Sequence, residues 1–125
     1  MLANLPYLEV LKGYVAFERT YWKLNEDIVF HKLKYLLLSE CYFLERWEAG
    51  HANFPVLEQL ILNSLYYLEK IPESIGEIMT LRFIRIKYCS SCVDISLRKF
   101  KKRNKDWEIM SFKLKSQLWY VKIHI

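Results

Sequence analysis

The sequence predicts an α/β fold in which about four repeats stack into a short horseshoe, with parallel strands along its concave face. Three observations lead to this prediction. Leucine is the most frequent residue, apolar positions recur at a nearly constant step, and residues 93–125 carry a different pattern of helical spacing. We therefore divide the chain into a repeat region, residues 1–92, and a C-terminal cap made of a helix and a strand, residues 93–125.

The repeat is defined by three segments that begin at Phe30, Phe54 and Met79. Each follows the spacing L-x-x-L-x-L-x-x-C/L, with Ile in place of Leu in the third strand. An earlier copy starts at Leu5. The step from one copy to the next is roughly 24–25 residues, and this spacing and period are the signature of leucine-rich repeats. The anchor residues are Leu8, Leu33, Leu57 and Leu81.

The L-x-L part of each repeat predicts a short strand whose alternate side chains point toward the core. The inward residues are Leu36 and Leu38, Leu60 and Leu62, and Ile84 and Ile86. One repeat cannot bury its own apolar face, so the repeats stack and neighbouring strands pair in parallel. The aromatic residues Trp47 and Phe54 are expected to fill the convex side.

The two ends of the repeat region look different from its middle. Gly13 occupies the second inward position of the first copy, which predicts a loosely covered first repeat. A free horseshoe normally shields its open end with a cap, and no such cap precedes Leu5. The chain is therefore expected to be the C-terminal end of a longer solenoid.

After Ile95 the repeat pattern stops and a helical pattern takes over. Apolar residues recur from Val93 to Trp107 at helical spacing, which predicts an amphipathic helix with a basic outer face. Asp94 or Ser91 is the expected N-cap. The alternation over residues 118–125 predicts a terminal strand beside the last repeat strand.

The formal net charge of +5 is unevenly distributed along the chain. Residues 1–92 hold ten Lys/Arg and eleven Asp/Glu, whereas residues 93–125 hold nine and three. The basic run at residues 98–105 supports an alternative function, which is association with nucleic acid or an acidic membrane surface. A solvated outer face of the capping helix is the simpler interpretation.

No catalytic, cofactor-binding or metal-binding residues are predicted. The three histidines lie in separate elements, and the carboxylates near Cys41 are expected on a solvated return loop. The C-x-x-C pair Cys89 and Cys92 fits inward repeat positions without a metal or redox role. An odd, sparse set of three cysteines indicates a reduced compartment. The expected location is the cytoplasm, with peripheral membrane association as the alternative.

The repeats resemble those of a family of plant immune receptors. The segments that carry the resemblance are residues 5–12, 30–38, 44–47, 54–60 and 68–90, the last beginning Leu-Glu-Lys-Ile-Pro-Glu-Ser-Ile-Gly. They are similar to the last leucine-rich repeats of solanaceous coiled-coil NB-LRR resistance proteins of the late-blight-resistance type. The resemblance covers residues 1 to about 95; the basic helix differs from the acidic one usual in the family.

The resemblance implies recognition and regulation rather than catalysis. In this family the repeat domain senses a pathogen effector, directly or through a guarded host protein, and holds the receptor's nucleotide-binding domain inactive. The sequence contains no phosphate-binding G-x-x-x-x-G-K-S/T motif, so that domain is absent from these residues. Protein partners are therefore expected, and no small-molecule substrate.

The expected binding surface is the concave face, where outward strand residues fall into three columns. The first holds Val10, Tyr35, Gln59 and Phe83, the second Lys12, Leu37, Ile61 and Arg85, and the third Tyr14, Ser39, Asn63 and Lys87. An exposed apolar patch with a basic rim is the pattern expected of an interaction site. The predicted partner-binding residues are Tyr35, Leu37, Gln59, Ile61, Phe83, Arg85 and Lys87.

Overall fold

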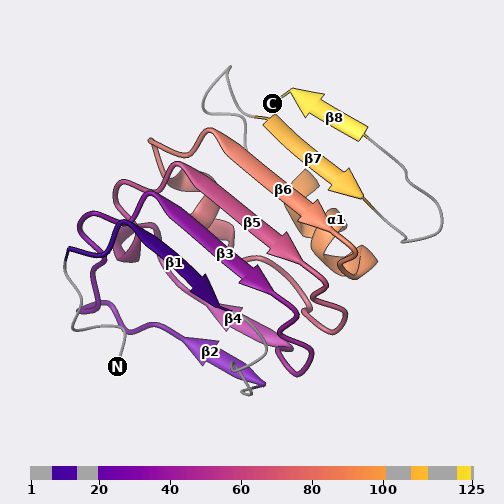
Figure 1. The fold of residues 1–125 in the computed structure, drawn as a ribbon, viewed down its shortest axis with the longest axis horizontal. Helices are drawn as coiled ribbons and strands as arrows, with labels where there is room; N and C mark the ends of the chain where they lie inside the picture. The colour runs from indigo at the N-terminus through magenta and orange to yellow at the C-terminus, as the bar shows by residue number, and fades with distance from the viewer. Residues whose placement is uncertain (1–6, 14–19, 101–107, 113–120, 125) are drawn as a thin grey trace.

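The computed structural model of the protein describes residues 7–13, 20–100, 108–112 and 121–124. Its main feature is a six-stranded sheet in the order β1-β3-β5-β6-β7-β8 (Figure 1). The strands are β1 (Val10–Gly13), β3 (Tyr35–Ser39), β5 (Gln59–Asn63), β6 (Phe83–Lys87), β7 (Glu108–Phe112) and β8 (Val121–His124).

The repeat spacing sets the register of the sheet. Leu36 of β3 pairs with Leu60 of β5, which in turn pairs with Ile84 of β6, and all of these pairings are parallel. A slip of one residue would turn the apolar set away from the core, so burial holds this register. The predicted α/β class with a parallel sheet is confirmed, and the described residues contain one α-helix.

The inward strand residues form the centre of the hydrophobic core. The six predicted inward side chains of β3, β5 and β6 are each at most 2 % exposed. Leu33, Leu57 and Leu81, which precede these strands, are fully buried beside them. The strand residues and the anchor leucines therefore contribute to one continuous core, as the repeat spacing predicts.

The first repeat is less well covered than the others. Leu8, Trp22, Leu24 and Ile28 are only partly buried against the core. A Cβ on Gly13 would lie 3.1 Å from Cδ2 of Leu38, so Leu38 of the next strand already occupies that space. The predicted looseness of this repeat is confirmed by its partial burial.

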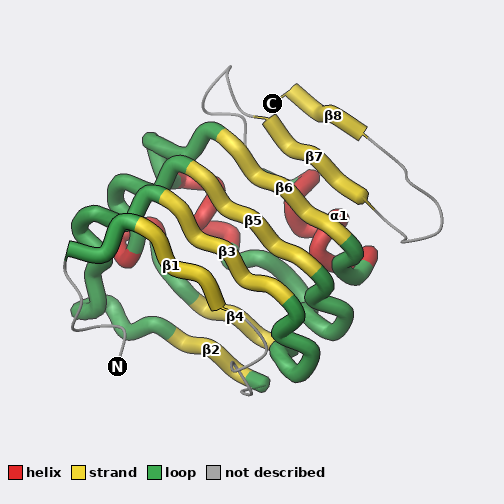
Figure 2. The backbone as a smooth tube through the Cα atoms, viewed as in Figure 1, coloured by secondary structure: helices red, strands yellow, loops and turns green. Residues whose placement is uncertain are grey.

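The return segments, which lead from one main strand to the next, contain short elements in place of long helices (Figure 2). They are β2 (Tyr21–Lys23), β4 (Arg46–Glu48), η2 (His51–Asn53) and η3 (Glu73–Glu77), and β2 and β4 form a second parallel sheet. Trp22 stacks on Trp47, and Phe30 stacks on Phe54, with ring centroids 5.5 and 5.6 Å apart. The predicted role of Trp47 and Phe54 in filling this side is confirmed.

The same backbone turn follows three consecutive strands. Glu40, Ser64 and Tyr88 each have a positive φ, between 55° and 57°. This conformation costs a non-glycine residue roughly 1–2 kcal/mol. The turn aims the amide of Glu40 at the carbonyl of Asn63, 2.9 Å away, and the amide of Ser64 at that of Lys87, 2.7 Å away. At Glu40 and Ser64 these hydrogen bonds between repeats offset the cost of the strained backbone.

The helix α1 (Ser91–Arg98) starts earlier and ends earlier than the sequence pattern predicts. Its N-cap residue is Ser90, so the assignment of the cap to Asp94 or Ser91 was wrong. The Ser90 hydroxyl instead donates a hydrogen bond to the carbonyl oxygen of Leu68, at 2.8 Å, and ties the helix to the preceding return segment. The buried face, Val93 and Leu97, agrees with the prediction. Residues 101–107 lie outside the described residues.

The strand beside the last predicted repeat strand is β7, and not the C-terminal strand. Ile109 of β7 pairs in parallel with Ile84 of β6, one repeat step earlier in the chain, so the repeat continues for one more strand. The predicted terminal strand is present as β8, but it pairs antiparallel with β7 (Figure 1). The expected pairing of the terminal strand with β6 was wrong, because the sequence reasoning missed β7. In β7 Ser111 stands opposite Ile86, so one of the inward apolar residues that mark the other strands is missing.

Candidate interaction surface

The outer face of the sheet, defined as the side turned away from the core, presents the predicted columns. Val10, Tyr35, Gln59 and Phe83 are paired across the first column, and Lys12, Leu37, Ile61 and Arg85 across the second. In the third column Ser39, Asn63 and Lys87 are paired, whereas Tyr14 lies outside the described residues. The predicted alignment of these residues on one face is therefore confirmed.

The predicted exposed apolar patch is not formed as expected. Leu37 is 7 % exposed and Ile61 is 2 % exposed, so neither offers free surface to a partner. Both lie in the middle column of the central strands β3 and β5, each between paired residues of two neighbouring strands. Tyr35 and Phe83 of the first column remain half-buried, and Gln59 between them is exposed. The accessible surface is thus more polar than the residue types alone suggested.

On β1, β3, β5 and β6 the charged groups of this face are cations. Lys12 is exposed and Arg85 and Lys87 are half-buried, whereas no outward position of β1, β3, β5 or β6 holds Asp or Glu. The ammonium group of Lys87 lies 5.3 Å from the ring centroid of Tyr88. Nε of Arg85 and Oδ1 of Asn63 are buried and make no hydrogen bond. A buried polar atom without a partner is unfavourable and can be satisfied by an incoming group.

The cysteines occupy different environments. Cys41 is buried and Cys89 half-buried, and desolvation by burial raises the pKa of each thiol to about 11. Cys92 is exposed on α1, so its expected inward position was wrong: the chain has already turned into the helix at Ser91. Among the described residues there is no group of three or more His, Cys, Asp or Glu side chains that could hold a metal ion.

Thiol labelling should distinguish the three cysteines. Since the thiolate is the reactive species, we expect one thiol per folded chain, Cys92, to react quickly with an aromatic disulfide reagent at pH 8. Cys41 and Cys89 should react at least 100-fold more slowly, and all three should react equally in 6 M guanidinium chloride. The Cys92→Ser variant, which should lose the fast phase, identifies the residue. Fast reaction of two or three thiols in the folded chain would contradict the burial described above.

The raised thiol pKa values also predict that the folded chain becomes less stable at high pH. The folded chain favours the thiol form of Cys41 and Cys89. Their contribution to the free energy of unfolding is therefore fully present below pH 9.0, the pKa of a thiol in the unfolded chain, and is lost as the pH rises toward 11.

The histidines and carboxylates form no catalytic arrangement among the described side chains. His31 is exposed, and the ring of His51 contacts the carboxylate of Glu77 at 3.4 Å on the surface. Glu40, Glu45 and Glu48 are exposed, as expected of a solvated return segment.

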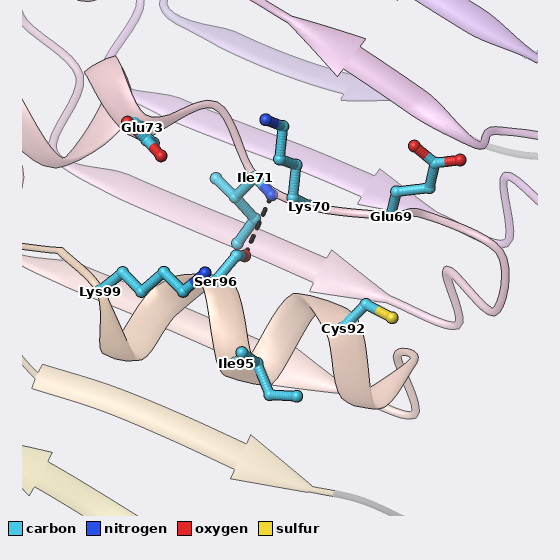
Figure 3. A pocket seen from close by; sticks show the side chains of 8 residues that line it. All are labelled: Glu69, Lys70, Ile71, Glu73, Cys92, Ile95, Ser96 and Lys99. Atoms are coloured by element: carbon cyan, nitrogen blue, oxygen red, sulfur yellow. Dashed lines mark hydrogen bonds between the residues drawn. The ribbon is translucent and has the colours of Figure 1, made fainter.

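A shallow cavity of about 250 Å³ lies between α1 and the third return segment (Figure 3). Its lining mixes charges, with Glu69 and Glu73 beside Lys70 and Lys99. Inside it the Ser96 hydroxyl accepts a hydrogen bond from the amide of Ile71, at 3.1 Å, and so fastens the helix to the repeat. The cavity lining serves this packing contact and presents no converging set of polar groups.

The described part of the basic run is partly structural. Phe100 is 7 % exposed, and its ring would lie 2.9 Å from a Cβ placed on Gly76. Arg98 is exposed and pairs with the carboxylate of Asp94 at 3.3 Å, whereas Lys99 is exposed at the helix end. Residues 101–105, which carry most of the charge, lie outside the described residues.

Two features of the surface and the repeats were missed by the sequence reasoning. Tyr42 and Tyr66 stack on the turns after β3 and β5, with Phe43 and Tyr67 exposed next to them. The signal in the sequence is that the aromatic pair Tyr42 and Phe43 recurs one repeat step later as Tyr66 and Tyr67. The second feature is Asn53, which is buried and bonds to the preceding repeat. No periodic signal marks it, because the matching positions hold Val29 and Glu77.

Comparison with known proteins shows which proteins the chain is similar to. The chain is 35 % identical over 114 residues, 89 % of its length, to late blight resistance protein R1-A of Solanum demissum. It is 37 % identical over 92 residues, 72 % of its length, to a late blight resistance protein homologue of the same species. The chain is related to the late blight resistance protein family. No family model matches it.

The relationship confirms the resemblance noted from the repeat segments. The chain spans only 9 % of the length of R1-A and 7 % of that of the second relative. The similarity therefore concerns one part of much longer relatives. Among the described residues, no helix of the chain is long and apolar enough to cross a membrane.

Proposed function

We propose that the chain is a stretch of leucine-rich-repeat solenoid that recognises a protein for a plant intracellular immune receptor. The partner is a pathogen effector, a guarded host protein or the receptor's own nucleotide-binding domain. Recognition of the first two serves effector sensing, and binding of the third serves autoinhibition. Kinship with late blight resistance proteins supports the defence role.

The observation that carries the proposal is the composition of the outer face. Its accessible part places two aromatic side chains, Tyr35 and Phe83, on either side of Gln59, in one paired column. Arg85 and Lys87 follow on the same face of β6. The few residues that dominate binding energy at protein interfaces are enriched in Trp, Tyr and Arg. Leu37 and Ile61, buried in the middle column of the same face, do not contact the partner in this proposal.

The test compares two double variants of the full chain as bait in leaf extract from plants infected with late blight. Tyr35→Ala/Phe83→Ala removes the aromatic side chains of the outer face. Tyr42→Ala/Tyr67→Ala removes a matched pair of exposed aromatic residues from the return side. We expect the first variant to lose at least tenfold in bound partner, about 1.4 kcal/mol, and the second to retain it.

Circular dichroism and urea unfolding must show that both variants are folded. Equal recovery of the same proteins by the wild-type chain and by Tyr35→Ala/Phe83→Ala would contradict recognition by the outer face. Loss only in Tyr42→Ala/Tyr67→Ala would place the site at the turns after β3 and β5, which hold these residues.

A further inference from the structure

On the strands β1, β3, β5 and β6 the outer face carries cations and no carboxylate. Lys12, Arg85 and Lys87 are its charged residues on β1, β3, β5 and β6, and all three are cations. The added strand β7 places one carboxylate residue in register, Glu108, opposite Phe83. It places Met110 and Phe112 opposite Arg85 and Lys87, so the register brings no acidic residue directly beside either cation.

The basic end of the face also holds two buried polar atoms that lack a hydrogen bond. Nε of Arg85 is a donor without an acceptor, and Oδ1 of Asn63 on the neighbouring strand is an acceptor without a donor. In the register Arg85 lies opposite Ile61, whose side chain is 2 % exposed. An apolar neighbour lowers the local dielectric, so a charge pair formed here is stronger than one in water.

The spacing of the two cations on β6 indicates the form of the partner segment. Arg85 and Lys87 are two residues apart on one strand, so their Cα atoms are separated by about 6.6 Å. An extended peptide has the same separation between alternate side chains. Two carboxylates at alternate positions of such a segment match the guanidinium and the ammonium groups, and a carboxylate suits the forked geometry of arginine.

We propose that the partner bound by the outer face presents an acidic, extended segment whose alternate carboxylates pair with Arg85 and Lys87. This rests on the proposed function and adds the chemistry of the partner. The amide of Asn63 binds the backbone of the same segment, and Phe83 packs against its apolar side chains. Lys87 leaves or shares its contact with the Tyr88 ring when the segment binds.

The experiment measures binding of fluorescent decapeptides to the full chain by anisotropy, at 50 and 300 mM NaCl. Three peptides have Glu, Gln or Lys at alternate positions between alanines, and a fourth probe is a single-stranded oligonucleotide. The protein variants are Arg85→Glu/Lys87→Glu, Arg85→Gln/Lys87→Gln, and the conservative Lys87→Arg. Lys70→Glu on a return segment is the control with a matched charge change, and Arg98→Glu/Lys99→Glu tests the basic helix.

We expect the Glu peptide to bind at least tenfold more tightly than the Gln peptide at 50 mM NaCl, and the Lys peptide not to bind. Arg85→Glu/Lys87→Glu should abolish binding of the Glu peptide, and the double Gln variant should reduce it to the level of the Gln peptide. Lys87→Arg and Lys70→Glu should stay within threefold of the wild type. Raising NaCl to 300 mM should weaken binding severalfold.

Four results would overturn the acidic partner. These are absence of Glu peptide binding, equal binding of the Glu and Gln peptides, loss of binding only in Arg98→Glu/Lys99→Glu, and tighter binding of the oligonucleotide through Arg85 and Lys87. The proposed function is judged separately, by the loss of partner in Tyr35→Ala/Phe83→Ala. If binding of the partner requires Tyr35 and Phe83 but is unchanged in Arg85→Glu/Lys87→Glu, the proposed function stands and the acidic segment is rejected.

Discussion

Replacing Leu60 with alanine is expected to lower the free energy of unfolding by about 3–4 kcal/mol, the largest effect of a single substitution considered for this chain. Leu60 is fully buried on β5, between Leu36 and Ile84 of the two neighbouring strands. Its truncation removes buried apolar surface and leaves a cavity shared by three repeats. Rigid strands on both sides limit how far the core can close around the gap.

Urea unfolding followed by circular dichroism measures this loss. The matched control is Gln59→Ala, one residue earlier on the same strand, whose side chain is exposed. That variant should stay within about 0.5 kcal/mol of the wild type. A loss below about 1 kcal/mol for Leu60→Ala, or an equal loss for Gln59→Ala, would show that the placement of Leu60 in the core and of Gln59 on the surface is wrong.

Replacing Asn53 with alanine is expected to cost about 2–4 kcal/mol, because several hydrogen bonds are lost together. Its side-chain amide donates to the carbonyl oxygens of Asn25 and Ile28, at 2.9 and 2.6 Å. Its side-chain oxygen accepts from the amide of Gly50, at 2.7 Å. Alanine leaves these backbone groups without partners in a site where Asn53 itself is 2 % exposed.

Asn63→Ala is the matched control for this second variant. Oδ1 of Asn63 is buried without a hydrogen bond, so its removal should change the free energy of unfolding by less than about 0.5 kcal/mol. Asn53→Asp should cost at least as much as Asn53→Ala, since it keeps the acceptor for Gly50 but turns a carboxylate oxygen toward the two carbonyl oxygens. Equal stability of Asn53→Ala and Asn63→Ala in urea unfolding would contradict the assigned hydrogen bonds.

The sequence was sufficient to predict the sheet because each main strand repeats the same buried positions. Leu36, Leu60 and Ile84 lie at a constant step, and only a stack of parallel strands buries all of them in one core. The step predicted the columns of the outer face for the same reason. The strand β7 was missed because Ser111 replaces an inward apolar residue, so its apolar pattern is too weak to predict a strand.

Exposure on the outer face was harder to predict than alignment. Alternation tells which side of the sheet a side chain takes, but it does not tell how closely its neighbours cover it. Leu37 and Ile61 take outward register positions and are still buried, and each has a paired strand on both sides. Asn53 and the positive φ of Glu40, Ser64 and Tyr88 depend on contacts between repeats, which leave no periodic trace in residue type.

The central claim is that a protein partner binds the outer face of the sheet. The most direct measurement is site-specific photo-crosslinking in leaf extract, with the photoreactive residue at Gln59 in one chain and at Tyr67 in another, both exposed positions. The account predicts a discrete protein adduct from Gln59, lost in the Tyr35→Ala/Phe83→Ala background, and none from Tyr67. An adduct from Tyr67 alone, or an adduct from Gln59 that survives loss of both aromatic residues, would contradict it.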